Sequence, residues 1–130
     1  MNDILVPISP GALLDKITIL RIKSARMTDA AKVANVRLEL SLLEKTWREA
    51  VGTADVADDE RALQGVNERL WVIEDDIRDK ERAQAFDARF IELARSVYIE
   101  NDERAAIKKR TNVKLGSRIV EEKSYKPYKA

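Results

Sequence analysis

Hydrophobic residues recur along most of this chain at alternating intervals of three and four positions. That spacing places them on one face of an α-helix. It predicts three long helices, running from Pro10 to about Met27, from about Ala30 to Ala50 and from Asp58 to about Arg82. A fourth stripe covers 86–97 and is followed by a short fifth helix, unless the two form one bent helix. The sequence therefore predicts an all-α bundle of four to five helices.

Capping residues indicate where these helices begin and end. Ser9 and Asp29 precede the first two stripes, and their side-chain oxygens suit an N-cap, which accepts a backbone hydrogen bond. Gly52 suits the end of the second helix, and Asp55 or Asp58 suits the start of the third. Because only a short loop separates the second and third stripes, we expect these helices to pack antiparallel as a long coiled-coil-like hairpin.

Both ends of the chain depart from the helical pattern. Residues 1–8 contain an extended apolar strip, Ile4–Ile8, and residues 116–130 form a tail without a helical stripe. Arg118–Lys123 is the other strand-like stretch, and we hypothesise that it pairs with the strip as a short β ribbon beside the bundle. With the helices in 9–115, the 130 residues are expected to form a single domain.

Composition narrows the chemistry available to the chain. Charged residues make up 36% of it and hydrophobic residues 45%, which is typical of helices with one solvated face. Neither cysteine nor histidine is present, which excludes thiolate or imidazole zinc sites and Ser/His/Asp triads. With 24 basic and 23 acidic residues, the net charge of +1 provides no field that would attract nucleic acid. No apolar run approaches the ~20 residues of a membrane helix, so we expect a soluble protein without membrane insertion. The lack of cysteine suits a reducing cytoplasm, where we expect the protein to be located. No cofactor is expected.

One strip of polar and aromatic side chains borders the core stripe of the third helix. Asn67, Trp71, Glu74 and Arg78 follow one another at intervals of four, three and four residues, so they share a helix face. Such a strip can hold a polar ligand by stacking and paired hydrogen bonds. The alternative is that Trp71 lies at the core edge and that Glu74 and Arg78 form a solvated ion pair worth ~0.3 to 0.5 kcal/mol.

The same region is rich in carboxylates, which raises the question of a metal site. Glu74, Asp75, Asp79 and Glu81 resemble in outline the magnesium-binding helices of all-helical nucleotide pyrophosphohydrolases. The two-motif carboxylate pattern of those enzymes is not reproduced, so no metal ligand is assigned.

A second candidate region combines a predicted helix start with basic residues. Asn101 and Asp102 precede Arg104 and Lys108, which share a helix face and, with backbone donors, suit a phosphate group. The alternative is structural capping, because a capping carboxylate at Asp102 already occupies those donors.

Basic residues are concentrated toward the C-terminus. The stretch from Arg104 to the end holds nine basic and two acidic residues, whereas 55–82 holds ten acidic and five basic. The tail, which includes Lys123 and Tyr125, is therefore expected to fold onto its own acidic helix or onto that of a second copy. Its basic, aromatic ending also suits stacking on single-stranded nucleic acid, but tyrosines without a fold to present them are a weak signal, and no nucleic-acid partner is expected.

Four segments resemble a family of small bacterial proteins classed as a domain of unknown function, namely "ILVPISPGALLDKITIL", "LWVIEDDIR", "YIENDERAAIKK" and "GSRIVEEKSY". The resemblance implies a role near glycosyltransferase and surface-polysaccharide functions, and it provides no catalytic residue. If these segments converge in space they line one polar site, with Lys123 and Tyr125 close to Asp15 or Asn101. From the residues alone, Asp15 is instead expected to face solvent in an ion pair.

Two functions remain open. The first is a non-catalytic interaction module, expected to be a homodimer through its helical stripes and to assist a protein partner in cell-surface glycan synthesis. The second is a ligand-binding or catalytic domain for an anionic metabolite such as a phosphorylated sugar or nucleotide. A concave pocket would favour the second function, and a flat charged face the first. The candidate ligand-binding residues are Asn67, Trp71, Glu74, Arg78, Asn101, Asp102, Arg104, Lys108, Lys123 and Tyr125.

Overall fold

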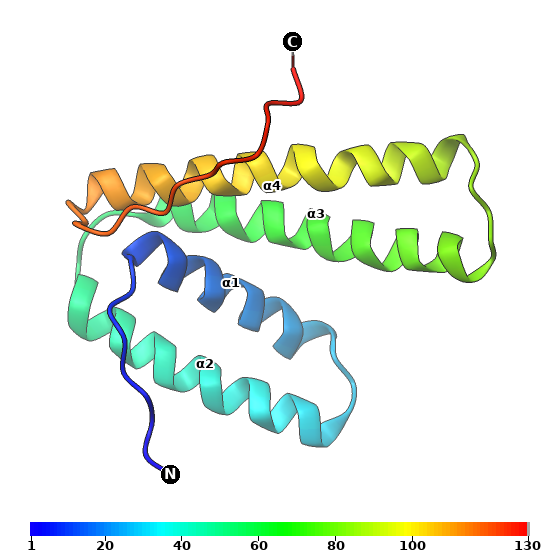
Figure 1. The fold of residues 1–130 in the computed structure, drawn as a ribbon. Coiled ribbons are helices and arrows are strands. Elements are labelled where there is room, and N and C mark those ends of the chain that lie inside the picture. The colour runs from blue at the N-terminus through cyan, green and yellow to red at the C-terminus, as the bar shows by residue number, and fades with distance from the viewer. Residues whose placement is uncertain (130) are drawn as a thin grey trace.

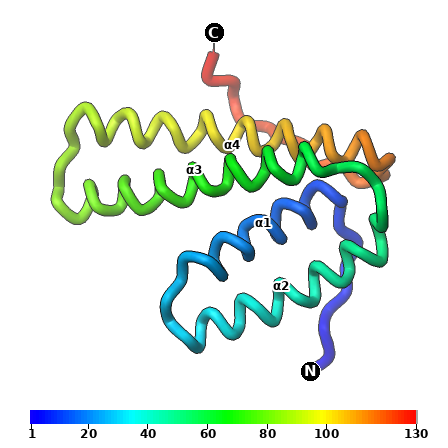
Figure 2. The backbone as a smooth tube through the Cα atoms, turned by 180° about the vertical axis from the view of Figure 1, so that it is seen from behind, coloured from blue at the N-terminus to red at the C-terminus, as the bar shows by residue number. Residues whose placement is uncertain are grey.

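The computed structural model describes residues 1–129, which form four α-helices and no strand (Figure 1). The helices are α1 (Pro10–Arg26), α2 (Ala30–Val51), α3 (Ala57–Arg82) and α4 (Ala88–Lys114). Helix α1 lies in the middle and contacts each of the other three, as the view from behind also shows (Figure 2). The prediction of an all-α helical bundle is confirmed.

The pairing of the helices differs from the prediction. The antiparallel hairpins are α1 with α2 and α3 with α4, and the expected hairpin of the second and third helices is wrong. The reason lies in α1, whose adjacent residues Leu13 and Leu14 are both buried although they point about 100° apart around the helix. Because α1 is apolar on more than one side, it takes the place between α2 and the α3–α4 hairpin.

The predicted fourth and fifth helices are the single helix α4. Asp87 caps it by accepting a hydrogen bond from the Phe90 N–H at 3.0 Å. Asn101 and Asp102 lie in its interior, so the prediction that either one starts a new helix is wrong. Neither glycine nor proline occurs between Asp87 and Lys114 to interrupt the helix.

Most of the other predicted helix ends are correct. The Ser9 side chain accepts from the Ala12 N–H at 3.2 Å, and the Asp29 side chain caps α2. Gly52 ends α2 with a positive φ of 63°, a conformation that glycine adopts without strain. The start of α3 is different, because Val56 takes the N-cap position and makes no side-chain capping bond.

The hydrophobic core lies where α1, α3 and α4 meet. Leu14, Leu63, Val66 and Ile107 form its centre, and Trp47 of α2 packs against it. The far end of the α3–α4 hairpin extends past α1 (Figure 1). Within residues 1–129, no helix is long and apolar enough to cross a membrane.

The predicted β ribbon is wrong. Residues 1–8 run past α2 and are exposed, whereas the tail after Gly116 folds back along α4 (Figures 1 and 2). The two stretches therefore follow different helices and cannot exchange backbone hydrogen bonds. The Ser117 N–H donates to the Asn112 carbonyl at 2.9 Å, which turns the chain back onto α4.

Candidate functional site

A polar face of α1 is buried against α3 and α4. Gly11, Asp15 and Thr18 share this face because they follow one another at intervals of four and three residues. Asp15 is only 4% exposed, so the expectation that it faces solvent is wrong. Gly11 makes the close approach feasible, since a Cβ atom there would lie 2.4 Å from the Lys108 carbonyl oxygen. Its N–H donates to Asn112 Oδ1 at 2.6 Å.

The buried Asp15 carboxylate holds Arg104 of α4 in a fixed orientation. Arg104 donates from Nε to Oδ1 at 2.8 Å and from Nη2 to Oδ2 at 2.5 Å, a bidentate pair. Asn67 of α3 donates from Nδ2 to Asp15 Oδ1 at 3.0 Å and to Thr18 Oγ1 at 2.9 Å. Arg104 also donates from Nη1 to Asn101 Oδ1 at 3.4 Å. Three helices thus fix one guanidinium group.

The electrostatic environment favours the charged form of Arg104. Hydrogen bonding to Asp15 is the main cause that raises the pKa of Arg104, and it outweighs the opposing effect of burial. The negative charges of Asp15 and Glu121 raise this pKa further. A permanent positive charge therefore stands at the edge of the buried network.

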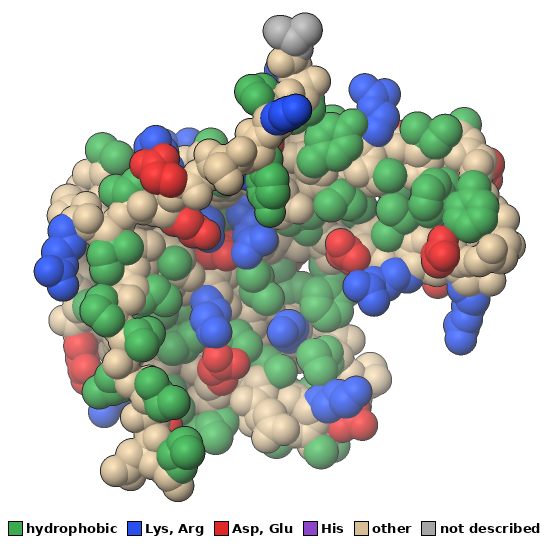
Figure 3. Space-filling model, in the orientation of Figure 1, with side chains coloured by type: hydrophobic (Ala, Val, Ile, Leu, Met, Phe, Trp, Pro, Cys, Tyr) green, Lys and Arg blue, Asp and Glu red, His purple; other side chains and the backbone are tan. Residues whose placement is uncertain are grey.

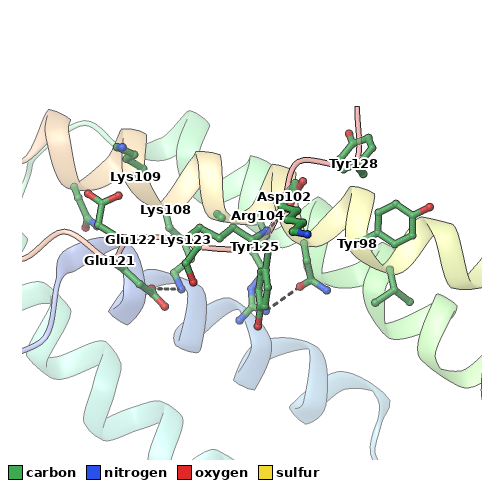
Figure 4. A pocket seen from close by; sticks show the side chains of 16 residues that line it. Tyr98, Asp102, Arg104, Lys108, Lys109, Glu121, Glu122, Lys123, Tyr125 and Tyr128 are labelled. Carbon is green, nitrogen blue, oxygen red and sulfur yellow. Dashed lines mark hydrogen bonds and ion pairs between the residues drawn. The ribbon is translucent and has the colours of Figure 1, made fainter. Parts of the chain in front are cut away.

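A pocket of about 640 Å³ lies between α4 and the tail, beside this arginine (Figure 4). Asn101, Arg104, Lys108 and Asn112 form its helical wall, because intervals of three and four residues place them on one face of α4. The tail covers this wall as it crosses the helix, and basic and acidic side chains lie side by side there in the space-filling view (Figure 3). The remaining lining residues are Val97, Tyr98, Asp102, Ala105, Lys109, Glu121, Glu122, Lys123, Ser124, Tyr125, Lys126 and Tyr128.

Basic side chains outnumber acidic ones in the pocket wall, with five against three. Two ion pairs attach the tail to α4. Lys108 Nζ lies 2.8 Å from Glu121 Oε2, and Lys123 pairs with Asp102. The tail therefore supplies both a cation and an anion to the same cavity.

Three tyrosines line the pocket together with these charges. Tyr98 of α4 and Tyr128 of the tail meet edge to face, with ring centroids 5.4 Å apart. The Lys123 ammonium lies 5.7 Å from the centroid of the Tyr125 ring. Rings with exposed faces next to cations suit a ligand that has both a flat or cyclic part and an anionic group.

The structure brings six of the ten candidate residues together in this pocket, namely Asn101, Asp102, Arg104, Lys108, Lys123 and Tyr125. Asn67 stands behind it and supports Asp15. Trp71, Glu74 and Arg78 do not line it, and Arg78 donates from Nε to Glu74 at 3.3 Å along the helix. In the described part of the chain, no group of three acidic side chains is arranged to hold a metal ion.

The tail lies along α4 and does not fold onto its own acidic helix, whereas contact with the acidic helix of a second copy stays a prediction. Instead, the basic end of α4 pairs with α3: Arg110 Nε and Lys114 Nζ lie 2.8 and 3.0 Å from the buried Asp59 carboxylate. Burial alone would raise the pKa of Asp59, but hydrogen bonds from these two cations outweigh it and hold the pKa below its usual 3.8.

Sequence reasoning missed Thr18, Asn112 and Tyr98 as parts of the site, and it placed Asp15 there only through the family resemblance. A signal was present for Asn112, because it extends the four-residue spacing of Arg104 and Lys108. For Asp15 and Thr18, the one signal in the residues themselves was their helical spacing from Gly11. Nothing local shows that this face is buried.

Comparison with known proteins identifies a family and no activity. No curated protein and no solved structure matches this chain. Residues 4–129 match a family of unknown function, DUF6165. Since the match covers nearly the whole chain, including α4 and the tail that form the pocket, the chain belongs to the family of unknown function DUF6165.

Proposed function

We propose that this protein binds a small anionic metabolite in the pocket between α4 and the tail. The observation that carries the proposal is the convergence of Arg104, Lys108 and Lys123 with three tyrosines around one cavity. The cavity volume of about 640 Å³ lies in the range of small-molecule sites, roughly 300 to 1,000 Å³. Phosphorylated sugars and nucleotides have the combination of cyclic and anionic parts that such a wall suits.

Arg104 is the central cation of the proposed site. A guanidinium group has five N–H donors, and the bonds to Asp15 and Asn101 use three of them. Two donors, one on each terminal nitrogen, are left for a ligand oxygen. Because Asp15 and Asn101 already fix the guanidinium, little side-chain entropy remains to be lost on binding.

Binding, rather than catalysis, is the activity that we propose. The pocket carboxylates Asp102 and Glu121 are engaged in ion pairs with Lys123 and Lys108. A general acid or base must instead reach the proton that it transfers in the substrate. The arrangement therefore suits recognition of an anion.

A thermal-shift panel of nucleotides, nucleotide sugars and sugar phosphates tests the proposal. A ligand at 100 times its Kd stabilises the folded state by ~2.7 kcal/mol, which raises the Tm of a chain of this size by roughly 8 to 13 °C. Lys108→Met should remove most of this shift. Arg78→Ala is the matched control, because it deletes an exposed cation outside the pocket and should leave the shift intact. The absence of a shift with every compound would contradict the proposal.

A second candidate function is an interaction module that forms a homodimer. Helix α2 has no buried residue, and Leu38 and Leu42 are exposed one turn apart on its outer face. We propose a second copy as the occupant of this face, and an enzyme of cell-surface glycan synthesis as the partner of the resulting dimer. Light scattering tests the first step: Leu38→Glu should give a monomer, whereas Ala50→Glu, which adds the same charge at the end of α2, should not. A wild-type protein that is monomeric at high concentration would refute it.

A further inference from the structure

The tail contributes an internal anion to the proposed binding site. We propose that the Glu121 carboxylate occupies the anion subsite of the pocket in the ligand-free protein, and that a phosphate or carboxylate group of the ligand takes its place. This inference rests on the proposed binding function. It adds where the negative charge of the ligand binds, and it identifies the Glu121 carboxylate as an internal competitor for that position.

The contact of Glu121 with Lys108 defines the subsite. Glu121 Oε2 lies 2.8 Å from Lys108 Nζ (Figure 4). The Lys108 side chain is only 16% exposed, so the cation is held in the wall of the pocket. The Glu121 side chain is 65% exposed, so the anion reaches this position from the solvent side. A largely covered cation that faces an exposed anion is an arrangement in which the anion can be exchanged.

Arg104 belongs to the same subsite. Its pKa is raised mainly by hydrogen bonding to Asp15, and the charge of Glu121 contributes as well, which indicates that the carboxylate lies within the field of both cations. Lys108 follows Arg104 by one helical turn, and both side chains line the pocket. A phosphate group in the place of Glu121 would meet the Lys108 ammonium and lie in the field of the Arg104 guanidinium.

The attachment of the tail is weak enough for such an exchange. Beyond Ser117, the described part of the tail makes no backbone–backbone hydrogen bond. The tail is held by side chains, including the ion pairs of Glu121 and Lys123. An ion pair with one exposed partner is a minor source of stability, so a ligand with two negative charges competes effectively with a single carboxylate. Binding would then release Glu121 while Lys123 stays close to Asp102.

Glu122 provides a matched control for this mechanism. It lines the same pocket and carries the same charge, but it makes no ion pair within the described residues. Glu121→Gln and Glu122→Gln therefore change the charge of the pocket equally. They differ in whether the competitor for Lys108 is removed.

Isothermal titration with inorganic pyrophosphate at constant ionic strength tests the proposal on the full chain. We expect Glu121→Gln to bind roughly two- to five-fold more tightly than Glu122→Gln, which is the effect of removing one partly exposed ion-pair partner. In a Lys108→Met background the two glutamine variants should bind alike, because the competition requires the lysine. This double-mutant comparison separates the effect of the Lys108–Glu121 contact on pyrophosphate affinity from the effect of the overall change in pocket charge.

The outcomes distinguish this inference from the proposed function. If wild type binds pyrophosphate but Glu121→Gln is no tighter than Glu122→Gln, the internal competitor is refuted and the binding function stands. If pyrophosphate binds to none of the variants while a compound of the thermal-shift panel does, the subsite assignment is refuted alone. If neither experiment detects binding, both proposals are wrong.

Discussion

Replacement of Arg104 by methionine tests the buried network that orients the site. The substitution keeps the apolar stem and removes both charge-assisted bonds to Asp15, which lie at 2.8 and 2.5 Å. It leaves a carboxylate that is almost fully buried, with Asn67 as the remaining side-chain donor. The cost is therefore the penalty of an unpaired buried charge, in addition to the loss of an attraction.

The size of the effect follows from the burial of the two partners. Breaking a fully buried ion pair costs ~3 to 5 kcal/mol. The Arg104 side chain is 30% exposed and Asn67 still donates to Asp15, so we expect a lower value, about 2 to 4 kcal/mol. Urea unfolding followed by circular dichroism at 222 nm measures this difference directly, because the whole fold is helical.

Two further variants make the test specific. Arg78→Met removes an arginine whose side chain is 79% exposed and whose partner lies one turn away, so it should cost no more than ~0.5 kcal/mol. The double variant Asp15→Leu/Arg104→Met removes both charges and should recover part of the loss. If Arg104→Met costs no more than Arg78→Met, the carboxylate does not depend on the arginine, and the orientation argument for the binding site is refuted.

Three other predictions concern packing and acid stability. Gly11→Ala should destabilise the protein by about 1 to 3 kcal/mol, because its Cβ would collide with the α4 backbone. Gly65→Ala inside α3 should instead stabilise the protein by ~0.5 to 1 kcal/mol, and thermal melts of the two variants test this difference. Leu63→Ala should cost about 2 to 5 kcal/mol in urea unfolding, since Leu63 is fully buried, while Ile91→Ala, at a position 58% exposed, should change stability by less than ~0.5 kcal/mol. Burial opposes ionisation of Asp59, but its two basic partners hold its pKa in the folded protein below 3.8. The stability that the Asp59 carboxylate contributes is therefore present above its unfolded-state pKa of ~3.9, and it is lost as the pH falls through the lower pKa of the folded state. Acid titration below pH ~4 should therefore show a smaller loss of stability in Asp59→Asn than in wild type, and parallel curves would contradict this reading.

The helices could be predicted from the sequence because their signals are local. The Ser9 and Asp29 caps and the Gly52 stop depend on residues within one turn, and each is found where the pattern placed it. The pairing of helices could not be read in the same way. It depends on the width of the apolar surface of α1, where both Leu13 and Leu14 are buried, and a search for single stripes overlooks this.

The basic half of the site was also visible in the sequence, whereas its support was not. Arg104 and Lys108 lie one turn apart, and this spacing alone places them on one face. The partner of Arg104 is Asp15, which is 89 residues away along the chain and looks like an ordinary surface carboxylate of a charged helix. Its burial results from the close approach of α1 to α4 at Gly11, which is a tertiary property.

The misread boundary inside α4 bears directly on function. Asn101 and Asp102 are residue types that favour helix starts, but their local preference is weaker than the continuous stripe of α4 around them. Had the helix restarted there, Asn101 would have non-helical backbone angles and would not lie one turn from Arg104 on a common face. Because α4 is continuous, Asn101, Arg104 and Lys108 form one straight wall, and the tail can follow that wall with its carboxylate at Lys108 and its lysine at Asp102. Asn101 and Asp102, for which the sequence left helix capping as the alternative, therefore line the pocket, because the helix does not use them to begin.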